Sequence, residues 1–187
     1  MSEHGTVQGA GEYLLGEVAT LSLSSTVHQT GHGVRYVFTG WVDEQGNILS
    51  TQSTIQVKLD KEHVIIHAKW REEYLVGVES PFGRVSGGGW YPRGGIAHIS
   101  LDRAEFVQDD TRYRFVEWKD QQGNSISTDL SLEIEVKGPI KLKAVWASEP
   151  VKFPILEFLT NPFIAAAILL LVFFLIDVRV LKRLKLT

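Results

Sequence analysis

The chain has 187 residues, a formal net charge of −3 and no cysteine. Without cysteine it forms no disulfide and carries out no thiol chemistry. Its acidic balance lacks the basic surface that nucleic-acid binding requires, so the sequence gives no support for a nucleic-acid partner.

An internal duplication occupies most of the chain, at an offset of 76 to 78 residues. Such a period is the sequence signature of a repeated folding unit. We therefore expect two repeats, at residues 1–70 and 74–148, joined by a short stiff connection that contains neither glycine nor proline. The matching segments are Gly11–Leu23 with Gly89–Leu101, Arg35–Asn47 with Arg112–Asn124, and Val64–Trp70 with Ile140–Trp146.

The beginning of the first repeat differs from that of the second. Repeat two opens with the apolar segment Tyr74–Glu79, whereas repeat one matches it only from His4 onward, opposite Phe82. The opening strand of repeat one would therefore lie before Met1. Since the first residues also lack the basic and apolar regions of a signal peptide, we expect the chain to be the C-terminal part of a longer exported polypeptide.

Each repeat has the pattern of short antiparallel strands. In residues 140–146 apolar side chains alternate with lysines, which is the period of a half-buried strand. Gln45-Gly-Asn47 and Gln122-Gly-Asn124 are typical hairpin turns. The predicted fold class is therefore all-β, with two tandem small antiparallel β-sandwich or barrel repeats followed by one C-terminal transmembrane α-helix.

The motifs of the second repeat support a family resemblance. They are Tyr74-Leu-Val-x-Val-x-Ser, Gly83-x-Val-Ser-Gly-Gly-Gly-Trp-Tyr, Tyr113-x-Phe-x-x-Trp and Leu142-Lys-Ala-Val-Trp. This order resembles the tandem β-rich repeats of secreted and cell-surface proteins of archaea and some bacteria. The first copy departs from it with Glu12 where the second has Trp90. The resemblance implies stalks, surface layers and ectodomains rather than a particular chemistry.

The C-terminal region reads as a membrane anchor. No side chain from Phe163 to Ile176 is polar, and continuing to Val180 approaches the ~20 residues that cross a bilayer. We expect a juxtamembrane segment at 149–161, a transmembrane helix at 162–181 and a basic cytoplasmic tail at 182–187, with the repeats extracellular. A buried core helix is the alternative for so short an apolar run.

Few residues have the pattern of a functional site. His28 and His32 are weak candidates for a metal site, because a third ligand would have to come from the surrounding loop. In the anchor, Asp177 and the small residues Ala165, Ala166 and Ala167 are candidates for helix–helix contact with a partner. The aromatic residues Trp90, Tyr91 and Tyr13 are candidates for stacking on a sugar ring. We expect no catalytic residue and no cofactor, since the sequence contains no nucleophilic-serine or phosphate-loop pattern.

The function predicted from these features is structural. We expect a non-enzymatic, single-pass membrane protein whose external repeats contact other membrane or surface-layer subunits, with the lipid bilayer as a further partner. Two alternatives stay open: a carbohydrate-binding or adhesive surface module, and an accessory subunit of a membrane enzyme complex such as a respiratory or oxidase assembly.

Overall fold

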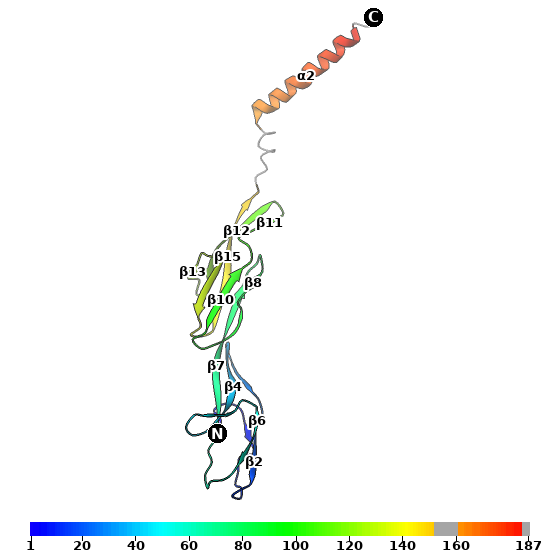
Figure 1. Cartoon of the computed structure of the whole chain (residues 1–187). Helices are drawn as coiled ribbons and strands as arrows, with labels where there is room; N and C mark the ends of the chain where they lie inside the picture. Colours follow the sequence, from blue (N-terminus) through cyan, green and yellow to red (C-terminus); the bar gives the residue numbers. More distant parts are fainter. Residues whose placement is uncertain (152–160, 185–187) are drawn as a thin grey trace. The chain divides into compact units, whose positions relative to one another are not determined.

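A computed structural model describes residues 1–151 and 161–184. In chain order these residues form strands β1 to β15 and then helix α2 (Figure 1). The chain divides into two compact units, one made of Met1–Phe106 with Tyr113–Ala147 and the other of Val107–Arg112 with the residues from Ser148 onward. Both sequence repeats lie mainly in the first unit.

The first repeat has two layers of strands. One layer is a three-stranded sheet in the order β1-β2-β6, and the other contributes to a larger sheet. Between them lies a small core of Phe38, Trp41, Ile66 and Ala68. The strands are β1 (Val7–Gln8), β2 (Val18–Leu23), β3 (Val27–Gly31), β4 (Val34–Val42), β5 (Ile48–Ser50), β6 (Thr54–Lys58) and the first half of β7 (His67–Glu79).

The second repeat reproduces this arrangement. Its three-stranded sheet has the order β14-β10-β8, and its core of nine buried residues is built around Trp118. Trp41 and Trp118, equivalent in the duplication, are both fully buried. The strands are β8 (Val85–Ser86), β9 (Gly89–Pro92), β10 (Ile96–Leu101), β11 (Glu105–Gln108), β12 (Thr111–Lys119), β13 (Ser125–Ser127), β14 (Ser131–Glu135) and β15 (Ile140–Pro150). The predicted repeats and their β-sandwich layers are thus confirmed.

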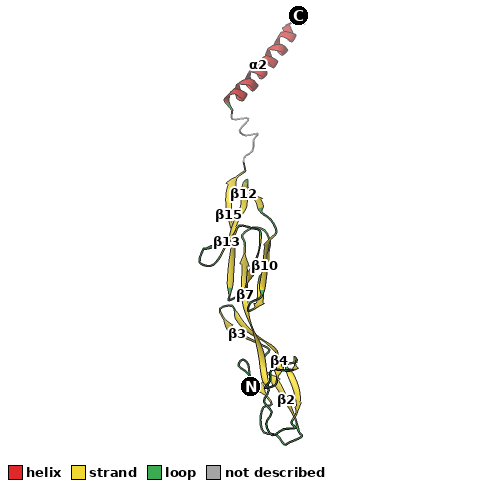
Figure 2. Ribbon diagram, turned by 60° about the vertical axis from the view of Figure 1, so that its left-hand side comes forward, coloured by secondary structure: helices red, strands yellow, loops and turns green. Residues whose placement is uncertain are grey.

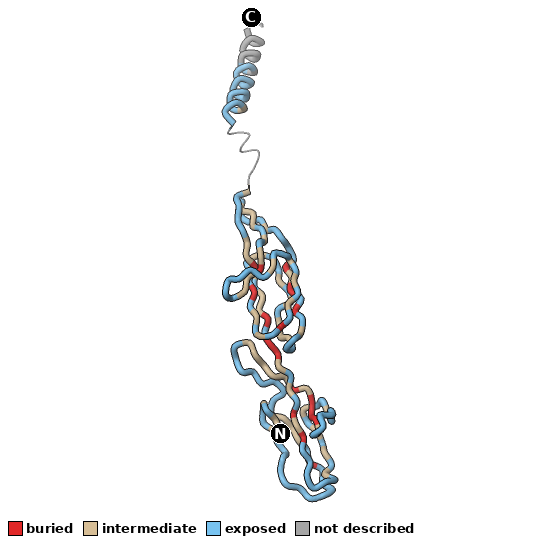
Figure 3. The backbone as a smooth tube through the Cα atoms, turned by 90° about the vertical axis from the view of Figure 1, so that its left-hand side faces the viewer, coloured by how far each residue is buried: buried red, intermediate tan, exposed pale blue. Residues whose placement is uncertain are grey.

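Strand β7 belongs to both repeats. It lies inside a nine-stranded sheet whose main path is β11-β12-β15-β7-β4-β3 (Figure 2). Its first half pairs with β4, and its second half pairs with β9 and β15. Residues 71–73, expected to connect two repeats, are therefore ordinary positions within one strand. The buried positions along β7 lie in both halves (Figure 3).

The predicted purely antiparallel pairing is wrong for β15. β15 runs parallel to β7, with Ile140 opposite Val76 and Leu142 opposite Val78. Parallel neighbours need a long crossover, and here the whole of repeat two forms that connection. The first and last strands of a repeat consequently lie side by side, an arrangement that the alternation of single strands does not reveal.

The predicted transmembrane helix is wrong. Helix α2 spans Pro162–Leu184, but within the described residues no helix is long and apolar enough to cross a membrane. The apolar run from Phe163 to Ile176 would extend only ~21 Å as a helix, against about 30 Å of hydrocarbon, before Asp177 interrupts it. The single-pass anchor at 162–181, and the location and orientation inferred from it, are corrected accordingly. Most of the segment 149–161 and the last three tail residues lie outside the described residues.

Candidate functional site

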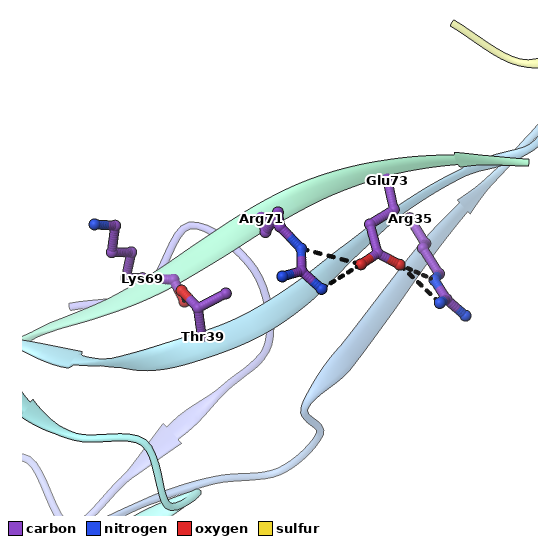
Figure 4. Close-up of polar contacts among 5 residues, drawn as sticks. All are labelled: Arg35, Thr39, Lys69, Arg71 and Glu73. Atoms are coloured by element: carbon purple, nitrogen blue, oxygen red, sulfur yellow. Dashed lines mark hydrogen bonds and ion pairs between the residues drawn. The ribbon is translucent and has the colours of Figure 1, made fainter. Parts of the chain in front are cut away.

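The junction of the two repeats contains a buried carboxylate. Glu73, in the middle of β7, is 4% exposed. One of its oxygens accepts hydrogen bonds from Arg35 on β4, with an Nη2–Oε2 distance of 2.7 Å. The other accepts two from Arg71, the shorter being 2.6 Å (Figure 4). Both oxygens are thus occupied by guanidinium groups.

The charges around Glu73 determine its protonation. Burial raises the pKa of its carboxyl, but the hydrogen bonds and positive charges of Arg35 and Arg71 outweigh burial and hold the pKa below its usual value. Glu73 is therefore ionised at neutral pH, and its side chain is almost closed to solvent. This geometry stabilises the junction and does not provide a general acid or base.

Arg35 also covers an aromatic ring of the other repeat. Its guanidinium carbon lies 4.5 Å from the ring centroid of Trp90, a cation–π distance. Trp90 is on β9, opposite Leu75 of β7. The proposed sugar-stacking face of Trp90 is thus covered on one side by protein.

The three aromatic candidates do not form one surface. Trp90 and Tyr91 are adjacent in a strand and so point to opposite faces. Tyr91 donates its hydroxyl to the carbonyl of Gly87 at 2.9 Å, and Tyr13 makes the equivalent bond to Gly9 at 2.7 Å. Tyr13 is therefore the counterpart of Tyr91 in repeat one, and no ring contact joins it to Trp90 or Tyr91 among the described residues.

Further contacts connect the repeats at the same junction. The amide of Leu75 donates to the carbonyl of Gly33 at 2.9 Å, and Arg93 forms an ion pair with Glu72 at 3.2 Å. Gly33 has φ of 78°, and a Cβ there would lie 3.1 Å from Pro139. Only glycine allows the β3–β4 turn to approach the second repeat this closely.

Each repeat holds a cluster of four rings. In repeat two Phe82 lies 4.1 Å from Tyr113 and 5.2 Å from Phe106, with Trp146 edge-on. In repeat one the equivalent rings are His4, His28, Tyr36 and Trp70. Sequence reasoning missed these clusters, although the offset that matches His4 with Phe82 also matches His28 with Phe106.

The two histidines predicted as metal ligands lie in different local structures. His28 lies on β3 and its ring stacks on His4 at 5.3 Å. His32 is in the following turn, with φ of 51°. In the part of the chain that the structure describes, no group of three or more potential ligands could hold a metal ion.

A shallow depression on the β8-β10-β14 sheet brings polar groups together without forming a catalytic arrangement. His98 Nδ1 lies 3.0 Å from Glu133 Oε1, and both side chains are largely exposed. The hydroxyls of Ser86 and Ser100, in the same depression, bond to each other at 2.7 Å. A nucleophilic serine requires a hydrogen bond to a base, and here the Ser86 and Ser100 hydroxyls bond to each other.

The candidates on α2 are only partly described. Ala165, Ala166 and Ala167 are exposed on the helix. The backbone of Asp177 belongs to α2, but its side chain is outside the described part of the structure. Their proposed role in partner contact stays a prediction.

Comparison with known proteins adds one match. Residues 1–73 match the model of the family described as "Divergent InlB B-repeat domain", a bacterial β-rich surface repeat. The match covers the first repeat and ends in the middle of β7. No curated protein and no solved structure matches the chain. The coarser part of the resemblance, a β-rich repeat of surface proteins, is thus supported, whereas its archaeal part and the C-terminal anchor are not.

Proposed function

We propose that the chain is a non-catalytic repeat module of a surface or extracellular protein, in which two rigidly joined repeats act as a spacer and make contacts with other proteins. The similarity of residues 1–73 to a surface-repeat family supports the location. The duplication supports the structural role, because each repeat places equivalent residues in a core and neither brings a nucleophile to a base. An accessory role in a membrane enzyme complex depended on the predicted anchor and is not included.

The observation that carries this proposal is the construction of the junction. Two repeats connected by a flexible linker would move relative to each other, as domains joined by such linkers usually do. Here β7 passes through both repeats as one strand, and the Glu73 carboxylate is held by Arg35 and Arg71 beside Trp90. A bend at residues 71–73 would break the backbone pairing of β7 with both β4 and β9.

Spin-label distance measurements test the rigidity. The chain has no cysteine, so Gln56→Cys on β6 and Glu133→Cys on β14 would be the only labelled positions, one in each repeat. We expect a single narrow distance distribution by pulsed electron resonance. Adding Glu73→Gln with Trp90→Ala should broaden it, whereas adding the exposed change Glu79→Gln should leave it narrow. A broad distribution in the unaltered junction would refute the spacer role.

The location is tested separately. Protease treatment of intact host cells should digest residues 1–151 of the chain, detected with an antibody to the second repeat. A cytosolic protein in the same cells is the control for lysis. Complete protection of the repeats in intact cells, followed by digestion after lysis, would contradict a surface location.

A further inference from the structure

Strand β6 forms a free edge of the small sheet in repeat one. The sheet has the order β1-β2-β6, and among the described strands β6 pairs only with β2 (Figure 1). Its side chains alternate, with Thr54, Gln56 and Lys58 exposed and Ile55 and Val57 half-buried against the core. β14 is the corresponding edge in repeat two and has the same alternation. The duplication therefore contains two versions of one edge.

The pairing of β6 with β2 determines which backbone groups face the free side. Beyond the end of β6, the amide of Leu59 donates to the carbonyl of Glu17 at 2.8 Å. Bonded and non-bonded pairs alternate in an antiparallel ladder, so in the observed register Ile55 and Val57 bond to β2. The N–H and C=O groups of the three exposed residues of β6 therefore point away from β2, toward a side where no described strand pairs.

Other edges of the described sheets are blocked or short. On β3 the Ser25 hydroxyl donates to the carbonyl of Val27 at 2.7 Å and accepts from its amide at 3.3 Å, and a bulge follows between Gln29 and Gly31. β1 and β8 have two residues each. β6 instead keeps a continuous register over five residues. Regular, unblocked edges of this kind are the ones that pair with another chain.

The two equivalent edges differ in charge. β14 carries Glu133 and Glu135 at exposed positions, whereas the matching positions of β6 hold Gln56 and Lys58. If two β14 edges paired antiparallel about their centre, Glu133 would face the Glu133 of the other copy, and like charges directly opposite each other destabilise a strand pair. Charged side chains protect natural edges from association in this way. Repeat one lacks that protection at the centre of β6.

The opening strand of a repeat does not reach this edge. In repeat two that strand is the second half of β7, which pairs with β9 and β15, and β14 keeps its free side. Because the repeats are equivalent, a strand at the same place in repeat one would leave the free side of β6 unchanged.

We propose that two copies of the chain pair antiparallel along β6, about a two-fold axis at Gln56. Gln56 then lies opposite the Gln56 of the second copy, and Lys58 lies opposite Thr54, so no like charges meet. Ile55 lies opposite Val57, which brings β-branched side chains together on the core side. The two small sheets become one continuous sheet, in an isologous contact that closes at two copies.

A charge at the two-fold axis tests the proposal on the full chain. Gln56→Glu recreates at β6 the opposed carboxylates that β14 would have, and it should raise the dissociation constant of the dimer at least ~10-fold in sedimentation equilibrium. Thr20→Glu is the matched control, because Thr20 is exposed on β2 directly across from Gln56 and its charge lies one strand away from the contact. Helix α2 is identical in both variants. Equal effects of the two changes, or a monomeric chain at the highest soluble concentration, would overturn the proposal.

Disulfide trapping identifies the register of the two strands. The chain has no cysteine, so Gln56→Cys gives each copy a single thiol. Facing Cβ atoms of an antiparallel pair are ~5 Å apart, within reach of a disulfide, and diamide as the oxidant should therefore yield a covalent dimer. Thr20→Cys should stay monomeric, because three strand spacings separate the two thiols by ~14 Å. Equal cross-linking at both positions would show that the copies meet without this register.

Hydrogen exchange locates the contact without any substitution. The amide of Gln56 should exchange more slowly as the concentration of the chain rises, whereas the equivalent amide of Glu133 should not change. A dimer in which the Gln56 amide exchanges at its monomer rate would place the contact elsewhere and refute the pairing of β6.

The edge lies outside the Glu73 junction, so dimerisation and the rigidity of the spacer can fail separately. In the spin-label experiment on the junction, an excess of unlabelled chain removes distances between copies. A narrow distribution within one copy, together with a chain that remains monomeric, would retain the spacer and reject the dimer.

Discussion

Trp146 donates its indole N–H to the hydroxyl of Ser80 at 3.0 Å, although the two residues are 66 positions apart. Ser80 directly follows β7 and Trp146 lies on β15, so the bond ties the beginning of repeat two to its end. The same hydroxyl donates to the carbonyl of Phe82, which lies in the ring cluster. Ser80 is thus a small residue whose hydroxyl has two structural partners.

Ser80→Ala should destabilise the second repeat by about 1–2 kcal/mol, because the half-buried indole N–H loses its acceptor. Urea denaturation followed by tryptophan fluorescence measures this change. Ser86→Ala is the control, since the Ser86 hydroxyl bonds to Ser100 at an exposed position and its loss should change stability by less than ~0.5 kcal/mol. Equal effects of the two changes would contradict the assigned role.

Glu73→Gln should destabilise the chain by about 1.5–3 kcal/mol at neutral pH, because it removes the charge-assisted hydrogen bonds from Arg35 and Arg71, whose guanidinium groups stay partly exposed to solvent. Glu79→Gln removes an exposed pair with Lys141 and should cost less than ~1 kcal/mol. Chemical denaturation of both variants at pH 7 gives the comparison.

The effect of Glu73 should also depend on pH. Since its pKa is lowered on folding, its contribution is present above the pKa of the unfolded chain and is lost as the pH falls through the lower pKa of the folded chain. The stability difference between the original chain and Glu73→Gln should therefore shrink below about pH 4. A difference that stayed constant from pH 7 to pH 3 would show that the ionised carboxylate is not the cause.

Trp90→Ala should cost about 2–3 kcal/mol, from lost packing at the junction and the lost contact with Arg35. Tyr13→Ala, at an exposed position of repeat one, should cost less. Thermal unfolding measures the loss of stability, and a glycan-binding assay on the same samples measures any loss of recognition. Loss of glycan binding by a Trp90→Ala chain of unchanged stability would instead favour the carbohydrate-binding alternative.

His4→Phe should stabilise repeat one by about 0.5–1.5 kcal/mol, because it recreates the ring that Phe82 supplies in repeat two. His4 already lies 3.7 Å from the Tyr36 ring, so the added apolar area falls on an existing stack. Denaturation at pH 7.5 is the measurement, and Phe82→His is the reciprocal change, expected to destabilise repeat two. Stabilisation by both would argue against equivalent clusters.

The carboxyls of Asp43 and Asp120 should titrate below their ordinary pKa. In each turn the side-chain amide of the asparagine four residues later, Asn47 or Asn124, is the largest cause, and backbone amides add to it. Asn124→Ala should move the pKa of Asp120 back toward its ordinary value and leave that of Asp43 unchanged, as measured by NMR. The turn bonds to each carboxylate are present above the unfolded pKa and weaken as the pH falls through the folded one.

The sequence predicts the repeats well because their signals are local. Alternation in residues 140–146, the Gln-Gly-Asn turns and the paired tryptophans each identify an element or a core position without reference to its neighbours. The cores around Trp41 and Trp118 follow directly from this pattern.

The features that the sequence does not predict depend on contacts between residues that are far apart along the chain. Glu73 reads as one of two surface acids, Glu72 and Glu73, because its partner Arg35 is 38 positions away. The parallel pairing of β7 with β15 is equally non-local. The C-terminal helix is a different case, since an apolar run of fourteen residues lies between the lengths typical of core helices and of membrane spans.

The double membership of β7 also bears on how such repeats recombine. The boundary between the sequence repeats falls inside β7, so this one strand contributes to the folded sandwich of both repeats. A gene fragment encoding residues 74–150 carries the half of β7 that pairs with β9 and β15, whereas the half that pairs with β4 stays with residues 1–73. Productive shuffling of these units therefore requires breakpoints just before an opening strand, near residues 71–73, rather than at any of the turns.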